Sequence, residues 1–401
     1  MLIALLCCAC SHRPDSRHLE LWTISLKPKY IPYMERVIKA FEAEHGVEVD
    51  WIDLPQASIL QKLMASIAGG VPPDVVNLTT ASALTLAHNG ALADLSSCSH
   101  LYKDRFYPNL WEAASYNGGV YAVPWYLSTR VLIYNKELLK RSGIRPEELS
   151  DKETLAEVSR RLKGTDACGW IPVVRILDDW RMAGIKVHDD KGRALFDTPE
   201  AAACLSRYAN LYSDDLVPKD FLIEGYQGAI ERYKQNGLAV LEAGPQLLLK
   251  IKADAPSVYE ATGIAPLPLD KAGIVPASMM NLVVPSSSQH KKLAAELAFY
   301  IANAKNQLDF AKEVPLLPSA CEAAEDEFFR IGKGEALQDE AMRVSVAQLP
   351  LARDCALSLP HASDLEKVLK EAVESCIYGK MTAQEALHQA AAEWNEILGL
   401  S

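Results

Sequence analysis

The sequence predicts an α/β fold in which short β-strands alternate with amphipathic helices. Apolar and polar residues alternate over 19–24, which is typical of a strand in a sheet. Residues 30–45 place apolar side chains at helical spacing and end at Gly46, and a second strand pattern follows over 47–54. Strand–helix–strand order at this spacing implies right-handed βαβ units and a largely parallel sheet.

The same alternation continues along the chain. A second helix is expected over 59–68, before Gly69 and Gly70, and a third strand over 74–78. The residue pattern changes over 118–124, and the alternation of strands and helices then restarts. Further strands are expected at 131–134, 169–176 and 238–241 and within 261–288, and further helices at 136–142, 290–304, 364–377 and 382–398, the last opened by a capping box at Thr382 and Glu385.

Composition and charge exclude several classes of protein. The 401 residues suggest roughly two to three domains at ~150 residues each. With 49% apolar and 23% charged residues, the chain is neither disordered throughout nor collagen-like nor a coiled coil. The 41 Lys and Arg residues against 52 Asp and Glu residues give a net charge of −11. That charge argues against nucleic-acid binding and against electrostatic docking on an anionic membrane.

The N-terminus is predicted to be an export signal. Residues 1–10 are all apolar, but a helix needs about 20 such residues to span a bilayer. The run is short for a signal peptide and lacks a cationic start, which a start codon set too far downstream would explain. Its end resembles the lipobox of bacterial lipoproteins, with Ala9 before Cys10. We therefore expect a signal segment over 1–9 and a tether over 10–18 lipidated at Cys10; the alternative is an ordinary cleaved signal peptide.

Six cysteines remain in the body of the chain, and no two of them lie within four residues of each other. This spacing excludes a CxxC redox pair and a zinc ribbon, and 15 disulfide pairings stay open. Most of these cysteines are expected to be small buried hydrophobic residues. The nine histidines are dispersed, so we expect no resident metal and no cofactor.

Four stretches of the chain follow a recognisable order: LWTISLKPKYIPYMERVIKAFEAEHGVEVDW, ILQKLMASIAGGVPPDVVNLTT, NGGVYAVPWYLSTRVLIYNKELLKRSGI and YKQNGLAVLEAGP. Together they resemble the extracellular solute-binding proteins of ABC importers, the sugar-binding group in particular. The fourth stretch matches the family's Gly-x-Ala-Met-x-x-x-Gly-Pro strand, with Val240 where Met is usual. The segments 282–319 and 379–398 complete a set that covers most of residues 19–398 in order.

The resemblance implies a two-lobed periplasmic-binding-protein fold of type II. Each lobe would be a mainly parallel sheet flanked by helices, with a ligand held in the cleft between the lobes and hinges at the connecting strands. The expected positions are 19–123 with 286–314 for the N-terminal lobe, 128–280 with 318–401 for the C-terminal lobe, and 123–129, 281–285 and 313–318 for the crossings.

Ligands of open parallel sheets lie beyond the carboxyl ends of the strands. The residues expected at those ends are Trp22, Thr23, Gln56, Thr80, Trp125, Tyr126, Asp179, Trp180, Tyr226, Gln246 and Asn281. Aromatic rings stack on the CH faces of sugars, each contact contributing about 1 kcal/mol, and the polar side chains can exchange hydrogen bonds with hydroxyl groups. Several candidates also have a purely structural alternative, such as a core position for the rings or an N-cap for Thr79 or Thr80.

Two departures from the family leave the identity of the sugar open. Gln246 stands where many sugar binders have an aromatic residue, and residues 277–281 lack the family's Gly-Gly.

A carbohydrate-active enzyme is the main alternative from another class. The paired acids Asp178-Asp179, Asp189-Asp190 and Asp214-Asp215 could be glycosidase carboxylates, but neighbouring residues diverge in direction and such pairs usually lie in solvated turns. The chain has no GxSxG, P-loop or HExxH motif. The sequence therefore favours a protein that is not an enzyme.

Two alternatives remain within the binding class. Arg130, Arg175 and Arg181 could clamp a phosphorylated or otherwise charged solute, although nearby acids could pair with them instead. The chain could also be a chemoreceptor co-binder or an adhesin. The favoured hypothesis is a monomeric receptor, exported and lipid-anchored to a bacterial membrane, that captures a sugar or oligosaccharide and delivers it to an ABC permease, with no nucleic-acid partner.

Overall fold

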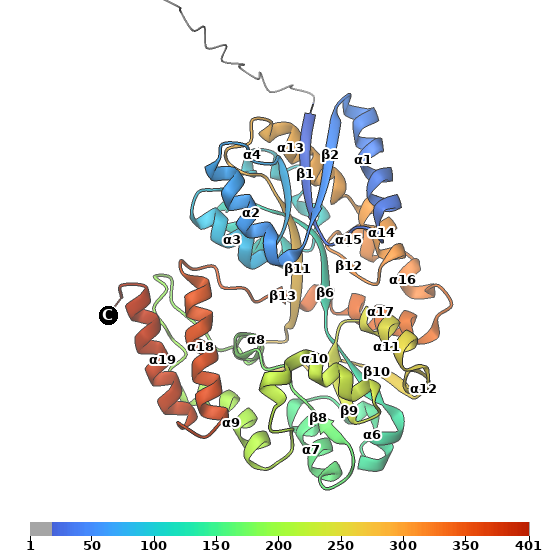
Figure 1. The fold of residues 1–401 in the computed structure, drawn as a ribbon, viewed down its shortest axis with the longest axis vertical. Coiled ribbons are helices and arrows are strands. Elements are labelled where there is room, and N and C mark those ends of the chain that lie inside the picture. The colour runs from blue at the N-terminus through green and yellow to red at the C-terminus, as the bar shows by residue number, and fades with distance from the viewer. Residues whose placement is uncertain (1–17, 401) are drawn as a thin grey trace, which may run out of the picture.

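The computed structural model describes residues 18–400, which form two lobes (Figure 1). The expected signal segment, tether and lipidated Cys10 lie outside these residues, apart from His18. Within the described chain, no helix is both long enough and apolar enough to cross a membrane.

The strands are β1 His18–Ile24, β2 Glu48–Leu54, β3 Val75–Thr79, β4 Ser115–Tyr116, β5 Gly119–Val120, β6 Val123–Thr129, β7 Val131–Asn135, β8 Cys168–Trp170, β9 Leu238–Ala243, β10 Thr262–Pro266, β11 Val275–Val283, β12 Leu317–Pro318 and β13 Ala352–Asp354. The helices are α1 Ile31–His45, α2 Gln56–Ala68, α3 Thr80–His88, α4 Ser96–Ser99, α5 Pro108–Ala113, α6 Lys136–Ser142, α7 Lys152–Leu162, α8 Ile176–Met182, α9 Pro199–Ser213, α10 Phe221–Lys234, α11 Leu247–Asp254, α12 Pro256–Glu260, α13 Lys291–Ile301, α14 Ala304–Glu313, α15 Cys321–Ala324, α16 Phe328–Ile331, α17 Ala336–Ala347, α18 Ala362–Ile377 and α19 Ala383–Ile397.

The first lobe is built on a sheet of order β12-β6-β11-β3-β1-β2, with β13 beside β11. Strand β1 pairs in parallel with β2 and β3, as βαβ units require, whereas β11 runs antiparallel to β3 and β6. Side chains of a strand alternate between its two faces. Leu19 and Leu21 therefore enter the core that α1 covers, while Trp22 and Ile24 pack with the cluster on α2 and α3.

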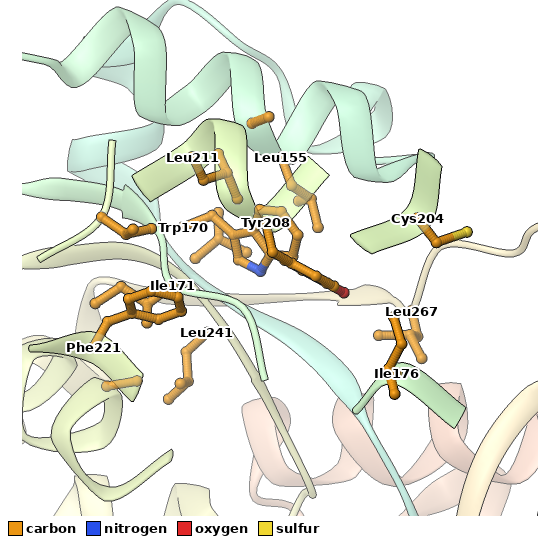
Figure 2. Packing of buried hydrophobic residues seen from close by; sticks show 14 of the residues in the cluster. Leu155, Trp170, Ile171, Ile176, Cys204, Tyr208, Leu211, Phe221, Leu241 and Leu267 are labelled. Atoms are coloured by element: carbon orange, nitrogen blue, oxygen red, sulfur yellow. The ribbon is translucent and has the colours of Figure 1, made fainter. Parts of the chain in front are cut away.

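The second lobe is built on a four-stranded sheet of order β10-β7-β9-β8. Strands β7 and β9 are fully buried and apolar at most positions, because helices enclose this sheet. Its core is the largest cluster of buried side chains, which includes Trp170, Tyr208 and Leu241 (Figure 2). The C-terminal helices α18 and α19 pack against each other and against α9, beside this lobe (Figure 1).

Strands β6 and β11 connect the lobes. Strand β6 leaves the larger sheet and continues through Arg130 into β7 of the smaller one. It coincides with the first expected crossing, and β12, the end of the third expected crossing, pairs with it. Strand β11 already runs beside β6 from Ala277, earlier than the expected crossing over 281–285. The exact lobe boundaries stay predictions.

One local expectation was wrong. The strand expected over 169–176 is only three residues long, because Pro172 has no N–H to donate to a neighbouring strand. The segment then turns into α8, which begins at Ile176. The capping box of the last helix is confirmed, with reciprocal hydrogen bonds between Thr382 and Glu385. The six described cysteines, Cys98, Cys168, Cys204, Cys321, Cys355 and Cys376, are all unpaired.

Replacing Gly169 by alanine should destabilise the protein by about 2–3 kcal/mol, at the upper end of the usual cost of overpacking. A Cβ atom at this position would lie 2.3 Å from the backbone nitrogen of Ser159 and 2.4 Å from its Cα, so helix α7 would have to shift. Gly237→Ala is the control, because its nearest neighbour is 3.3 Å away. Urea unfolding measures both, and equal losses would contradict this account of the β8–α7 packing.

Candidate functional site

A cavity of about 730 Å³ lies between the two lobes, beside the connecting strands. This size is typical of a small-molecule site. The residues that line it come from both lobes and from the strands between them. They are Gln56, Thr79, Thr80, Ala81, Tyr126, Ser128, Val174, Arg175, Ile176, Leu177, Asp178, Leu222, Ala277, Ser278, Met279, Met280, Leu316, Asp354, Cys355, Ala356, Glu366, Leu369, Lys370, Val373 and Glu374.

The first lobe contributes uncharged groups at the beginnings of helices α2 and α3. Thr79 is the N-cap of α3, where its hydroxyl accepts from the N–H of Ser82 at 3.3 Å. The first turn of a helix presents N–H groups that have no partner within the helix. This side of the cavity therefore offers hydrogen-bond donors to oxygen atoms of a ligand.

Thr80 is oriented from behind by a buried amide. Asn281 Nδ2 donates to Thr80 Oγ1 at 3.0 Å, and Asn77 Nδ2 donates to the carbonyl of Asn281 at 3.1 Å. Because the Thr80 oxygen already accepts from Asn281, its hydroxyl hydrogen is left to donate elsewhere. Asn281 is itself fully buried, so it supports Thr80 and does not line the cavity.

The connecting strands form the middle of the cavity wall. Tyr126 and Ser128 of β6 line it, and so do residues 277–280 of β11. Tyr126 is the single aromatic ring among the described lining residues. Its ring packs edge-on against Phe310, with 5.4 Å between the ring centroids, which holds it in place.

The charged groups come from α8 of the second lobe, from α18, and from β13, which pairs with the connecting strand β11. Five residues at helical spacing, from Glu366 to Glu374, place one face of α18 in the cavity. Asp354 stands at the end of β13, where its carboxylate accepts from the N–H groups of Met279 at 3.0 Å and Ala356 at 3.1 Å. This wall therefore offers hydrogen-bond acceptors.

Arg130 lies behind the cavity in a buried network of charges. It pairs with Asp178 at 2.9 Å and with Glu242 at 3.4 Å, and Trp170 Nε1 donates to Glu242 at 3.1 Å. Burial raises the pKa of Asp178, and the charge of Arg130 opposes that rise. The network holds the Asp178 carboxylate at the cavity wall.

Asp179 points the other way, into the core of the second lobe. It pairs with Lys152 and accepts from the hydroxyl of Tyr208. Burial, followed by the charge of Asp179, raises the pKa of Tyr208 well above its ordinary value. The Asp178-Asp179 pair therefore diverges, as expected for adjacent residues, and the expectation that Asp179 binds a ligand is not supported by its position.

The structure brings three of the eleven predicted residues to the cavity: Gln56, Thr80 and Tyr126. Four others are buried in or beside the larger sheet: Trp22, Thr23, Trp125 and Asn281. Trp125 stacks on Phe310, with 5.8 Å between the ring centroids and 18° between the planes. Thr23 donates to Asp53 at 2.6 Å and accepts from Trp51 Nε1 at 2.7 Å. These four side chains do not line the cavity, so their contact with a ligand stays a prediction from the sequence.

The remaining predicted residues also lie away from the cavity lining. Trp180 is fully buried, stacked on Phe196, and donates to the carbonyl of Ala201 at 3.2 Å. Tyr226 is exposed on α10, four residues after the lining residue Leu222 and just beyond a kink at Gly225. Gln246 is exposed before α11, with its side chain folded against Gly244.

Sequence reasoning missed Asp354 and the α18 face. The α18 residues follow the ordinary pattern of an amphipathic helix, so the sequence carries no sign that part of this face meets a cavity. Asp354 follows a strand of only three residues, which is too short to recognise from periodicity.

The three arginines proposed to clamp an anion are engaged within the protein. Arg130 pairs with Asp178 and Glu242, and Arg181 donates to the carbonyl of Ala356 at 3.4 Å. Arg175 alone lines the cavity, where it lies 3.7 Å from Asp178. Within residues 18–400, no group of three or more His, Cys, Asp or Glu side chains could hold a metal ion.

A family model described as bacterial extracellular solute-binding protein matches residues 36–338, well over half of the chain. The chain belongs to this family. A binding protein of Brucella abortus is 22% identical to this solute-binding protein over 411 residues, covering 99% of this chain and 97% of that one. The galactooligosaccharide-binding protein of Bacillus subtilis is 24% identical over 376 residues, covering 88% and 84%.

A solved structure supports the fold. The oligosaccharide periplasmic-binding protein from Synechococcus sp. MITs9220 superposes on this solute-binding protein with a TM-score of 0.83 and 30% sequence identity, covering 95% of this chain and 99% of that one. The two-lobed periplasmic-binding-protein fold expected from the sequence is thereby confirmed.

Proposed function

We propose that this solute-binding protein is the extracytoplasmic receptor of an ABC importer and that it captures a sugar or oligosaccharide in the interlobe cavity. The observation that supports this proposal most directly is the cavity itself, which is lined by residues of both lobes. Its lining combines one aromatic ring, Tyr126, with many hydrogen-bonding groups. Sugars present CH faces to rings and hydroxyl groups that both donate and accept. The donor-rich wall at α3 and the acceptor-rich wall at α18 suit such a ligand.

The names of the relatives agree with this class of ligand. The Bacillus subtilis relative is a galactooligosaccharide-binding protein, and the Synechococcus structure is described as an oligosaccharide-binding protein. The proposed partner is an ABC permease, and the proposed setting is a monomer exported and held at a bacterial membrane through Cys10. No catalytic step is proposed, because these relatives are binding proteins.

A thermal-shift screen tests the substrate class. The panel contains neutral mono- and oligosaccharides, amino sugars, phosphorylated sugars, amino acids and polyamines. We expect a saccharide to raise the melting temperature in a concentration-dependent manner, because a ligand that binds only the folded state stabilises it. Stabilisation by phosphorylated sugars or amino acids alone would contradict the proposal, and hydrolysis of chromogenic glycosides would point to an enzyme.

Replacing Tyr126 by alanine should weaken binding of the stabilising saccharide about 5- to 10-fold, since a ring contact contributes about 1 kcal/mol. Tyr126→Phe keeps the ring and should bind almost as the wild type does. Isothermal titration calorimetry measures both. Equal affinities of the alanine variant and the wild type would remove Tyr126 from the site.

A further inference from the structure

The carboxylates of the cavity outnumber its cations. Four acidic side chains line it, namely Asp178, Asp354, Glu366 and Glu374, against Arg175 and Lys370. Lys370 pairs with Glu374 at 3.7 Å, and Arg175 lies at the same distance from Asp178, which Arg130 already holds at 2.9 Å. Within residues 18–400, Asp354 and Glu366 form no ion pair. Burial raises the pKa of Glu366, and the charge of Arg175 opposes that rise. Arg175 therefore offsets part of the negative charge that these two carboxylates bring to the cavity, and the described side chains leave the rest unmatched.

Hydrogen bonds hold the Asp354 carboxylate in a fixed orientation. Two backbone N–H groups, one from β11 and one from the loop after β13, fix both of its oxygens. A carboxylate has about four acceptor positions, so two remain for a ligand. A hydrogen bond to a charged donor is stronger than one to a neutral hydroxyl group. The strongest partner for these positions is thus a cation.

The opposite wall of the cavity indicates which other functional groups the ligand has. The opposite wall, at the starts of α2 and α3, has no charged side chain among its lining residues and offers N–H and hydroxyl donors. Its partner groups are ligand oxygens. A ligand that presents hydroxyl or ring oxygens on one side and an ammonium group on the other satisfies both walls.

We infer that the preferred ligand is an amino sugar, with a protonated amine held by Asp354 and Glu366. This inference rests on the proposed sugar-binding function and narrows its substrate class.

Matched saccharides that differ only at C2 test the inference. Titrations at low salt compare cellobiose (hydroxyl), the unacetylated β-1,4-linked glucosamine dimer (ammonium) and its di-N-acetylated form, together with glucose against glucosamine and galactose against galactosamine. We expect each amine to bind at least 10-fold more tightly than its neutral counterpart. Raising the salt concentration should shrink that gap, because salt screens the ionic part of the interaction.

Three variants separate charge from fold. Glu366→Gln and Asp354→Asn should each reduce the ratio of amine affinity to neutral-sugar affinity by 5-fold or more. The ratio is the readout, because both side chains can also accept from hydroxyl groups of a neutral sugar. The Glu366 side chain makes no hydrogen bond within residues 18–400, so its variant tests the idea even if Asp354→Asn folds poorly. Glu371→Gln is the control, because this exposed residue on the same helix pairs with Lys367 and does not line the cavity.

The outcomes are distinguishable. A neutral sugar that binds as tightly as its amine, or a preference that survives both variants, would overturn this inference and leave the sugar receptor standing. Failure of every saccharide to bind would overturn the proposed function and the inference together, and spermidine binding without any saccharide would do the same.

Discussion

Replacing Arg130 by methionine should destabilise the folded protein by about 3–5 kcal/mol at neutral pH, the usual cost of removing one partner of a buried ion pair. The guanidinium group lies 2.9 Å from Asp178 and 3.4 Å from Glu242, and both carboxylates are buried. Without it, two negative charges remain in a poorly solvated site. Urea unfolding of the wild type and the variant measures the loss.

The same variant should show a diagnostic pH dependence. Burial already raises the pKa of Asp178, and the loss of Arg130 removes the charge that opposes this rise. A carboxyl group whose pKa is higher in the folded than in the unfolded state contributes stability at low pH that is lost as the pH rises. The stability deficit of Arg130→Met should therefore shrink as the pH falls from about 7 to about 5.

Arg141→Met is the matched control for this experiment. Its ion pair with Asp166 has the same length, 2.9 Å, but both side chains are exposed. Exposed pairs contribute less than about 1 kcal/mol. A loss for Arg130→Met as small as that of the control, or a deficit independent of pH, would show that the buried network does not carry the stability assigned to it.

Trp125→Ala should destabilise the protein by about 3–5 kcal/mol, as is usual for truncating a large aromatic residue in a core. Trp125 has no exposed surface and packs between the rings of Phe310 and Tyr126. Sequence reasoning would have expected loss of binding with an intact fold. The structure reverses that order, so the fall in the urea midpoint should be the primary effect.

Trp125→Phe keeps part of the packing and should lose markedly less stability. Under conditions where the Trp125→Ala variant is still folded, its affinity for the saccharide should fall only slightly. That fall should come from displacement of the neighbouring Tyr126 ring. Complete loss of binding with an unchanged urea midpoint would place Trp125 in the site after all.

Local periodicity explains why much of the fold could be predicted. The βαβ units over 18–79 depend on short-range patterns and on a helix end at Gly46, where the backbone is left-handed with φ of 65°. The long pairing of β6 with β11 joins residues about 150 positions apart, so no local sequence pattern could predict it. Where the sequence pattern was ambiguous, as over 169–176, a single proline decided the outcome.

The site was less predictable because its walls come from distant segments. Successive side chains of a strand point to opposite faces, so Trp125 and Tyr126 could not both meet the ligand. The sequence identified strand β6 but not which of its two faces lines the cavity. Likewise, nothing in the α18 pattern distinguishes a helix face that meets solvent from one that meets a cavity, and the contacts of Asp354 depend on β11.

Hydrogen–deuterium exchange with the saccharide that stabilises the protein most tests the central claim, that the ligand lies in the interlobe cavity. The account predicts slower exchange on both sides of that cavity: at the start of α3, in the segment 354–356, and along α18 from Glu366 to Glu374. Protection confined to one lobe, or centred on the separate surface hollow lined by residues 185–190, would contradict it.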